Sequence, residues 1–317
     1  MHVIGAKVHP VLATTIAVLL FLSAGYAQSA NTPDGQKIEN KDDYNSSILL
    51  DLQQGPERRL DEARKLGVVA ETGDPYAQYL LGTLYRLGKK HPSQLFERDD
   101  DKAAKYLSNA AVNGQVFAMA GMAEVELRRK QPMGAMIWAQ AFAKYEAVYQ
   151  EISNDKGGSH QAYAAFLIQR SFDELGHSDA VQKQIGRYCL GFEQQYDAKI
   201  RAALSDSREK QEHRIKGDGD DLQQILPGKI DAEMISPSEQ RMRSPGYAIF
   251  LVGVNAKGRV EKLMAVDSLP DEIFAAGLEG VVRRSHFGTA KKSTELRWAF
   301  VPMSYDDQSV QLKNLGQ

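Results

Sequence analysis

The sequence predicts an α+β protein, with an all-α helical-repeat domain (an α-solenoid) followed by a small β-β-α-β domain. Three observations predict this order. Residues 46–206 are rich in good helix formers and are broken by short turn signals. Within that stretch, a pattern of small residues recurs at a fixed spacing. After Pro245, aromatic and β-branched residues alternate with polar ones, as they do in strands.

The first 27 residues have the pattern of a cleavable signal peptide. Lys7 precedes an apolar run over residues 11–24, which is shorter than the roughly 20 residues that a membrane-spanning helix needs. Small residues precede a cleavage point between Ala27 and Gln28. We therefore expect a periplasmic protein. The alternative is that the segment stays uncleaved and anchors the chain in the inner membrane, facing the periplasm.

The remaining boundaries follow from changes in composition. Residues 28–45 are polar and predict a flexible leader, and residues 207–244 are charged and predict a linker. The small C-terminal domain is expected over residues 245–305, and residues 306–317 form a tail.

Composition and motifs argue against several classes of function. The chain of 317 residues is 43% hydrophobic and 25% charged, with a formal net charge of −2, so it lacks the basic excess of nucleic-acid-binding proteins. Its single cysteine, Cys189, cannot form an intramolecular disulfide. The histidines lack metal-ligand spacing, and the common catalytic motifs are absent. We therefore expect no cofactor, no metal and no enzymatic activity, with a cell-envelope enzyme kept as a remote alternative.

The repeat is visible at two turns that lie 41 residues apart. The first copy holds Ala70, Gly73 and Ala77, and the second holds Ala111, Gly114 and Ala118. Alanine lets the two helices of a hairpin approach closely, and glycine adopts the left-handed conformation that ends the first helix. Helix pairs of this kind bury their apolar faces by stacking into a solenoid.

Residues 60–126 resemble the Sel-one-like repeat, a relative of the tetratricopeptide repeat. The residues that match its pattern are Ala77, Leu81, Gly82, Leu84, Tyr85, Gly88, Asp100, Ala104, Tyr106, Ala110, Ala111 and Gly114. The chain departs from it in a longer loop between helices and in Ala123, which replaces a helix glycine. The resemblance implies an all-α scaffold that binds other proteins without catalysis.

The C-terminal domain is expected to contain three strands and one helix. Residues 247–254 and 259–267 predict a hairpin, and Pro270 opens a helix for which Ser268 is a candidate N-cap. A third strand follows over residues 295–301. The tight hairpin and the helical crossover predict the strand order second, first, third, which leaves the third strand at an edge. The helix covers one face of the sheet, and the other face is either packed or wet.

This block resembles the C-terminal domain of the TonB energy-transducer family. The matching residues are Gly246, Val254, Gly258, Val260, Ser268, Phe274, Ala276, Val281, Phe287, Phe300 and Pro302. The long proline-rich linker of that family is missing here, and so is its anchor pattern. The resemblance implies the fold and the capture of a peptide by strand addition.

These observations predict a non-enzymatic periplasmic interaction protein whose helical groove and small domain bind protein or peptide partners of the cell envelope. The expected peptide-binding edge is Glu295, Leu296, Arg297, Trp298, Ala299, Phe300 and Val301. The alternative is a TonB-type transducer, with its N-terminal segment retained as an anchor and an outer-membrane transporter as its partner. The sequence sets neither the partner's identity nor the oligomeric state.

Overall fold

The structure is a computed structural model, and it describes residues 44–153, 161–216, 226–227, 244–288, 296–305 and 310–312. All of these residues belong to one compact unit, Lys41–Gln317. The predicted signal peptide, with its cleavage point between Ala27 and Gln28, lies outside the described residues. So do most of the predicted leader, linker and tail.

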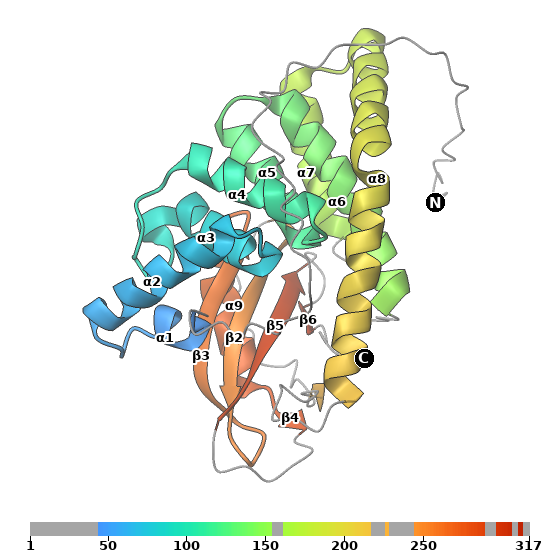
Figure 1. Cartoon of the computed structure of the whole chain (residues 1–317). Helices are drawn as coiled ribbons and strands as arrows, with labels where there is room; N and C mark the ends of the chain where they lie inside the picture. Colours follow the sequence, from blue (N-terminus) through green and yellow to red (C-terminus); the bar gives the residue numbers. More distant parts are fainter. Residues whose placement is uncertain are drawn as a thin grey trace, which may run out of the picture. The chain divides into compact units, whose positions relative to one another are not determined.

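The α+β class is confirmed, since helices precede a small, mainly antiparallel sheet (Figure 1). The helices are α1 (Ser46–Leu50), α2 (Pro56–Glu71), α3 (Pro75–Leu87), the 3-10 turn η1 (Gly88–Lys90), α4 (Asp100–Val112), α5 (Val116–Arg128), α6 (Pro132–Ser153), α7 (Gln161–Leu175), α8 (Asp179–Lys216) and α9 (Ile273–Arg284). The strands are β1 (Leu226–Pro227), β2 (Gly246–Val254), β3 (Val260–Leu269), β4 (Phe287–Gly288), β5 (Arg297–Tyr305) and β6 (Val310–Leu312). We call α1 to α8 the helical array.

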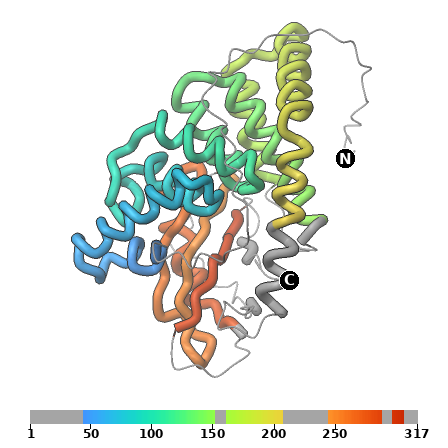
Figure 2. Tube along the Cα trace, in the orientation of Figure 1, coloured from blue at the N-terminus to red at the C-terminus, as the bar shows by residue number. Residues whose placement is uncertain are grey.

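The turns of the array have the chemistry that the sequence predicts. Gly73 and Gly114, which follow α2 and α4, have φ of 98° and 91°. Asp74 caps α3 by accepting a hydrogen bond from the backbone N–H of Ala77 at 2.7 Å. Asp99 caps α4 in the same way, through the N–H of Lys102 at 2.9 Å. These local signals set the ends of successive helices, which pack side by side along the chain (Figure 2).

Small residues bring three helices of the array close together around Leu107 of α4. A Cβ atom at Gly82 of α3 would lie 2.8 Å from Leu107 Cγ, and one at Gly121 of α5 would lie 3.2 Å from Leu107 Cδ1. The alanines of the repeat are also fully buried: Ala77, Ala110, Ala111 and Ala118. Gly121, two residues before Ala123, therefore makes the close approach in the second hairpin.

The main sheet has the order β3-β2-β5-β6. The predicted order of the first three strands is confirmed, and β2 is antiparallel to both of its neighbours. The third strand runs from Arg297 to Tyr305, so it begins and ends later than predicted, and Glu295 lies outside the described residues. Two features were not predicted. The strand β6 pairs with the end of β5, and β1 pairs with β4 in a separate two-stranded sheet.

The main sheet lies between two layers. Its α9 face carries Ala248, Phe250, Val252, Val254, Val301 and Met303, which share a core with α9. Its other face carries Tyr247, Ile249, Leu251, Val266 and Leu269, which belong to the core of the helical array. The face whose covering was left open by the sequence is therefore packed on the array.

A β-bulge in β3 determines which side chains reach each layer. Ile249 pairs with Asp267 and Phe250 pairs with Ala265, so Val266 is an extra residue in the strand. Because of it, Val266 and Asp267 both face the array, whereas Ser268 faces α9. The Ser268 hydroxyl accepts a hydrogen bond from the N–H of Ala275 at 2.9 Å. The prediction of Ser268 as the N-cap is wrong, since Glu272 occupies that position, and Ser268 instead bonds to the first turn of α9 from within the strand.

Candidate functional site

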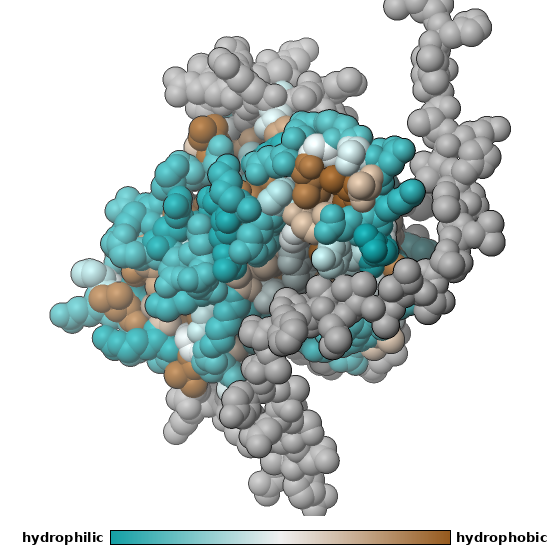
Figure 3. Space-filling model, turned by 90° about the horizontal axis from the view of Figure 1, so that it is seen from above, coloured by the Kyte–Doolittle hydropathy of each residue, from teal (hydrophilic) through white to brown (hydrophobic). Residues whose placement is uncertain are grey.

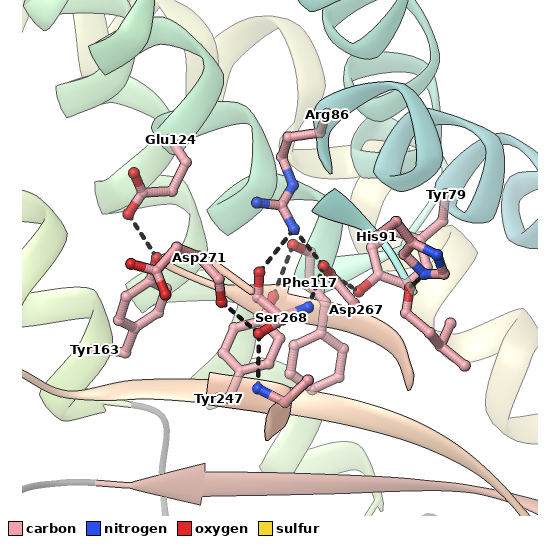
Figure 4. Close-up of polar contacts among 12 residues, drawn as sticks. Tyr79, Arg86, His91, Phe117, Glu124, Tyr163, Tyr247, Asp267, Ser268 and Asp271 are labelled. Atoms are coloured by element: carbon pink, nitrogen blue, oxygen red, sulfur yellow. Dashed lines mark hydrogen bonds and ion pairs between the residues drawn. The ribbon is translucent and has the colours of Figure 1, made fainter. Parts of the chain in front are cut away.

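A group of buried polar side chains lies where α3 and the loop after it meet the end of β3 (Figure 4). We call Tyr79, Arg86, His91, Asp267 and Ser268 the polar cluster. Tyr79 and Arg86 lie seven positions apart on α3, which puts them on the same side of that helix. His91 lies in the loop between α3 and α4, whose length departs from the Sel-one-like pattern.

Arg86 and Asp267 form an ion pair that is almost completely buried, with 2% and 1% of each residue exposed. Arg86 Nη2 donates to Asp267 Oδ1 and also to the carbonyl oxygen of Ser268, at 2.9 Å. The hydroxyl of Tyr79 donates to Asp267 Oδ2, and the backbone N–H of Ser268 donates to Asp267 Oδ1 at 2.7 Å. Three donors therefore satisfy the Asp267 carboxylate.

The environment of the pair affects both of the groups that contact Asp267. Burial is the largest influence on the pKa of Arg86 and lowers it, but the charge of Asp267 and the neighbouring tyrosines together raise it above its usual value. Burial, followed by the charge of Asp267, raises the pKa of Tyr79 well above its usual value of 10.0. Arg86 is therefore charged and Tyr79 is neutral at neutral pH. Arg86 Nε and Nη1 are buried without a hydrogen-bond partner among the described residues.

His91 connects the loop after α3 to the strand. Its Nδ1 accepts a hydrogen bond from the N–H of Ser93 at 3.0 Å, so Nε2 carries the proton in the neutral ring. Nε2 lies 3.3 Å from the carbonyl oxygen of Val266, to which it donates. Burial lowers the pKa of His91 from 6.5 to about 4. The ring is therefore neutral at neutral pH.

Aromatic side chains continue the contact beyond the polar cluster. The ring of Tyr247 on β2 lies 5.1 Å from that of Phe117 on α5 and 5.6 Å from that of Tyr163 on α7, measured between centroids. The hydroxyl of Tyr247 donates to the carbonyl oxygen of Phe117 at 3.2 Å. Glu124 accepts from the hydroxyl of Tyr163 at 2.7 Å. The array and the sheet thus share one core, in which the hydroxyls of Tyr247 and Tyr163 are hydrogen-bonded.

Two ion pairs lie at the margin of this contact. Lys90 of η1 pairs with Glu272 at 2.9 Å, and Lys262 of β3 pairs with Asp51 at 3.0 Å. The side chains of Lys90 and Lys262 are 64% and 31% exposed, so each pair is worth less than a buried one.

The polar cluster holds two parts of the fold together, and its burial argues against chemistry on a substrate. Its five members are each at most 6% exposed. Among the described residues, no group of three or more His, Cys, Asp or Glu could hold a metal ion. Within the same part of the chain, no helix is both long and apolar enough to cross a bilayer.

The predicted edge residues lie on both faces of the sheet. Trp298 and Phe300 are half-buried and pack against the core of the array, whereas Val301 is buried on the α9 side. The polar cluster contains none of the predicted edge residues. Sequence reasoning missed Arg86 and Asp267, and it considered His91 only as a metal ligand. The spacing of Tyr79 and Arg86 on an otherwise apolar helix was the available signal.

The predicted repeat residues occupy structural positions. Tyr85 stacks on Tyr106 with ring centroids 6.1 Å apart and meets Phe96 edge-on at 4.9 Å. Gly88 has φ of 58°, and a Cβ there would lie 2.5 Å from the backbone nitrogen of Arg98. These residues pack the array, as their repeat positions predict.

The surface of the described residues adds no large apolar area on the face that Figure 3 shows, which is mostly hydrophilic with small separate apolar patches. Comparisons of the chain with family models, with curated proteins and with solved structures give no match.

Proposed function

We propose that this chain is a non-enzymatic cell-envelope protein that binds a protein or peptide partner by adding a strand to its sheet. The observation that carries the proposal is the outer edge of β5. The strand β6 pairs with β5 only from Met303 to Tyr305. No other described strand pairs with the outer edge from Arg297 to Pro302. The unpaired backbone groups of an edge strand are a template for an extended peptide.

The side chains along this edge support an apolar, extended partner. Trp298 and Phe300 point to the array face and are half-buried, so part of each ring is open to a neighbouring strand. Val301 and Ala299 alternate with them on the α9 face. An added strand would place alternate side chains beside these two sets, and aromatic neighbours across strands contribute roughly 0.2–1 kcal/mol per pair.

The sequence predicts that a groove of the helical array also binds a partner, and we retain this idea only in a narrower form. We assign α2 to α5 to two Sel-one-like repeats of a short solenoid. The side of this solenoid that carries Tyr79 and Arg86 packs against the chain's own sheet. Any partner of the array must therefore use another side, and the array's main role is to hold the sheet.

A proline scan of the edge strand tests the capture of a peptide. In an antiparallel strand, alternate N–H groups point to the two neighbouring positions, so proline is tolerated only where the N–H points away from β2. We would replace Trp298, Ala299, Phe300 and Val301 by proline, one at a time, and retain the variants that fold by circular dichroism. Peptides selected from a displayed library of envelope-protein segments would supply the ligand, with binding followed by fluorescence anisotropy.

The folded proline variants should bind the selected peptides at least about tenfold more weakly than wild type, which corresponds to about 1.4 kcal/mol. Alanine or serine at the same position is the matched control, since it keeps the backbone donor and should bind much more tightly than proline. Folded proline variants that bind like wild type would exclude the β5 edge as the site. Failure to select any peptide would count against capture of extended segments altogether.

A further inference from the structure

The other edge of the main sheet is β3, and its end is occupied by side chains. We propose that side chains of the helical array and of β3 itself block the end of this edge by making the hydrogen bonds that a neighbouring strand would make, and thereby oppose strand pairing there. The residues that do this are Arg86, His91 and Asp267. This inference goes beyond peptide capture and does not depend on it.

Three consecutive polar groups of the β3 backbone carry the inference. The carbonyl oxygen of Val266 accepts from His91 Nε2 at 3.3 Å. The N–H of Ser268 donates to Asp267 Oδ1 at 2.7 Å, and the carbonyl oxygen of Ser268 accepts from Arg86 Nη2 at 2.9 Å. β3 has β2 as its only neighbour in the main sheet of the described residues. Two donors and one acceptor from side chains thus stand where a further strand would supply the same set.

The bulge at Val266 makes this arrangement possible. It turns Asp267 to the array, where the carboxylate can accept from Arg86 and from the N–H of the next residue. An inward-facing charge at a strand edge is also a known means of preventing edge-to-edge pairing, because a new strand would leave the charge without its partner. The Asp267 carboxylate therefore satisfies the edge and opposes an added strand.

The blocking groups are not open to replacement from solvent. Arg86, His91 and Asp267 are each at most 2% exposed. The loop that carries His91 is fixed at its two sides, since Arg59 Nη2 donates to the carbonyl oxygen of Ser93 at 2.6 Å and Lys90 pairs with Glu272. This gives a role to the loop that is longer than the Sel-one-like pattern: it extends from the array to the sheet edge.

Removal of these side chains should open the edge to a second copy of this chain, because an exposed strand edge pairs most readily with another edge of the same kind. The test variant combines His91→Phe with Arg86→Met and Asp267→Leu, which removes the blocking groups without leaving a buried charge alone. The matched control is Arg128→Met with Asp100→Leu, a second Arg–Asp pair at 2.8 Å that lies between α5 and α4, away from the sheet. Both variants are made in the full chain.

Sedimentation velocity over a range of concentrations and amide exchange at Ser268 give the two readouts. The triple variant should self-associate beyond the wild-type state, and its Ser268 amide at low concentration should exchange at least about tenfold faster, equivalent to about 1.4 kcal/mol. The control should match wild type in both. If the triple variant does not fold, His91→Phe alone decides by sedimentation velocity, because its Ser268 N–H keeps Asp267 as its acceptor. Wild-type sedimentation in a folded variant overturns the proposal. Normal peptide binding at β5 in the same variant would show that the proposed function still holds, so the failure of one can be told apart from the failure of the other.

Discussion

The stability of this protein should fall below pH 6.5 in a way that depends on His91. Burial lowers the pKa of His91 to about 4 in the folded protein, against its usual value of 6.5. The folded state therefore binds the proton more weakly than the unfolded state does. The contribution of the neutral ring to stability is complete above pH 6.5 and is lost as the pH falls from 6.5 through 4. His91→Gln removes the titration and keeps a polar side chain.

The size of the effect follows from the two pKa values. The two pKa values differ by about 2.5, which corresponds to about 3 kcal/mol when the pH is well below 4. At pH 5 the same two values give a loss of about 2 kcal/mol relative to neutral pH. Wild type should therefore lose about 2 kcal/mol more unfolding free energy than His91→Gln between neutral pH and about pH 5.

Urea unfolding at several pH values, followed by circular dichroism, measures this difference, because the carboxylates that titrate in both proteins cancel in the comparison. His177→Gln is the matched control, since the side chain of His177 is 59% exposed. This variant should not reproduce the effect of His91→Gln. Parallel pH profiles for wild type and His91→Gln would refute the reasoning. They would mean that the ring of His91 takes up its proton as readily in the folded state as in the unfolded state, although protonated Nδ1 can no longer accept from the N–H of Ser93.

Two further predictions concern the buried ion pair and the glycine turns. Arg86→Met should lower the unfolding free energy by about 3–5 kcal/mol because it leaves Asp267 charged and unpaired, and adding Asp267→Leu should restore most of the loss in urea unfolding. If the double variant instead loses the sum of the unfolding free energies lost by the two single variants, the pairing of Arg86 with Asp267 does not explain the cost. Gly73→Ala should cost about 1–2 kcal/mol for its φ of 98° in open space, whereas Gly88→Ala should cost more because its Cβ meets the backbone of Arg98. Thermal unfolding compares the two, and equal costs would show that the contact with Arg98 relaxes freely.

The features that the sequence predicted correctly depend on local chemistry. Gly73 and Gly114 have the left-handed backbone that the sequence predicts at the end of the helix before each of them. The order of the first three strands follows from a tight hairpin and one helical crossover, both of which are short-range features. The bond between Ser268 and the first turn of α9 is also short-range, since Ala275 lies only seven residues away, but the N-cap position itself is held by Glu272.

The polar cluster could not be predicted because its parts meet across nearly two hundred positions of the chain. Arg86 and Asp267 are far apart in sequence, and no local pattern pairs them. The bulge at Val266 also interrupts the alternation that would have placed Asp267 on the α9 side. For the same reason the sequence did not predict what covers one face of the sheet, since the side chains that cover it come from distant helices. The fourth strand, β6, is too short to give a pattern of its own.

The single extra residue in β3 has a consequence for how this molecule tolerates change. Asp267 and Ser268 are neighbours in the chain, yet one faces the array and the other faces the start of α9. Deletion of Val266 would remove the bulge without changing these directions, because Ala265, Asp267 and Ser268 would then alternate regularly opposite Phe250, Ile249 and Ala248. Loss of Val266 should therefore be tolerated better than loss of Asp267 or Ser268, each of which makes a hydrogen bond to a different layer.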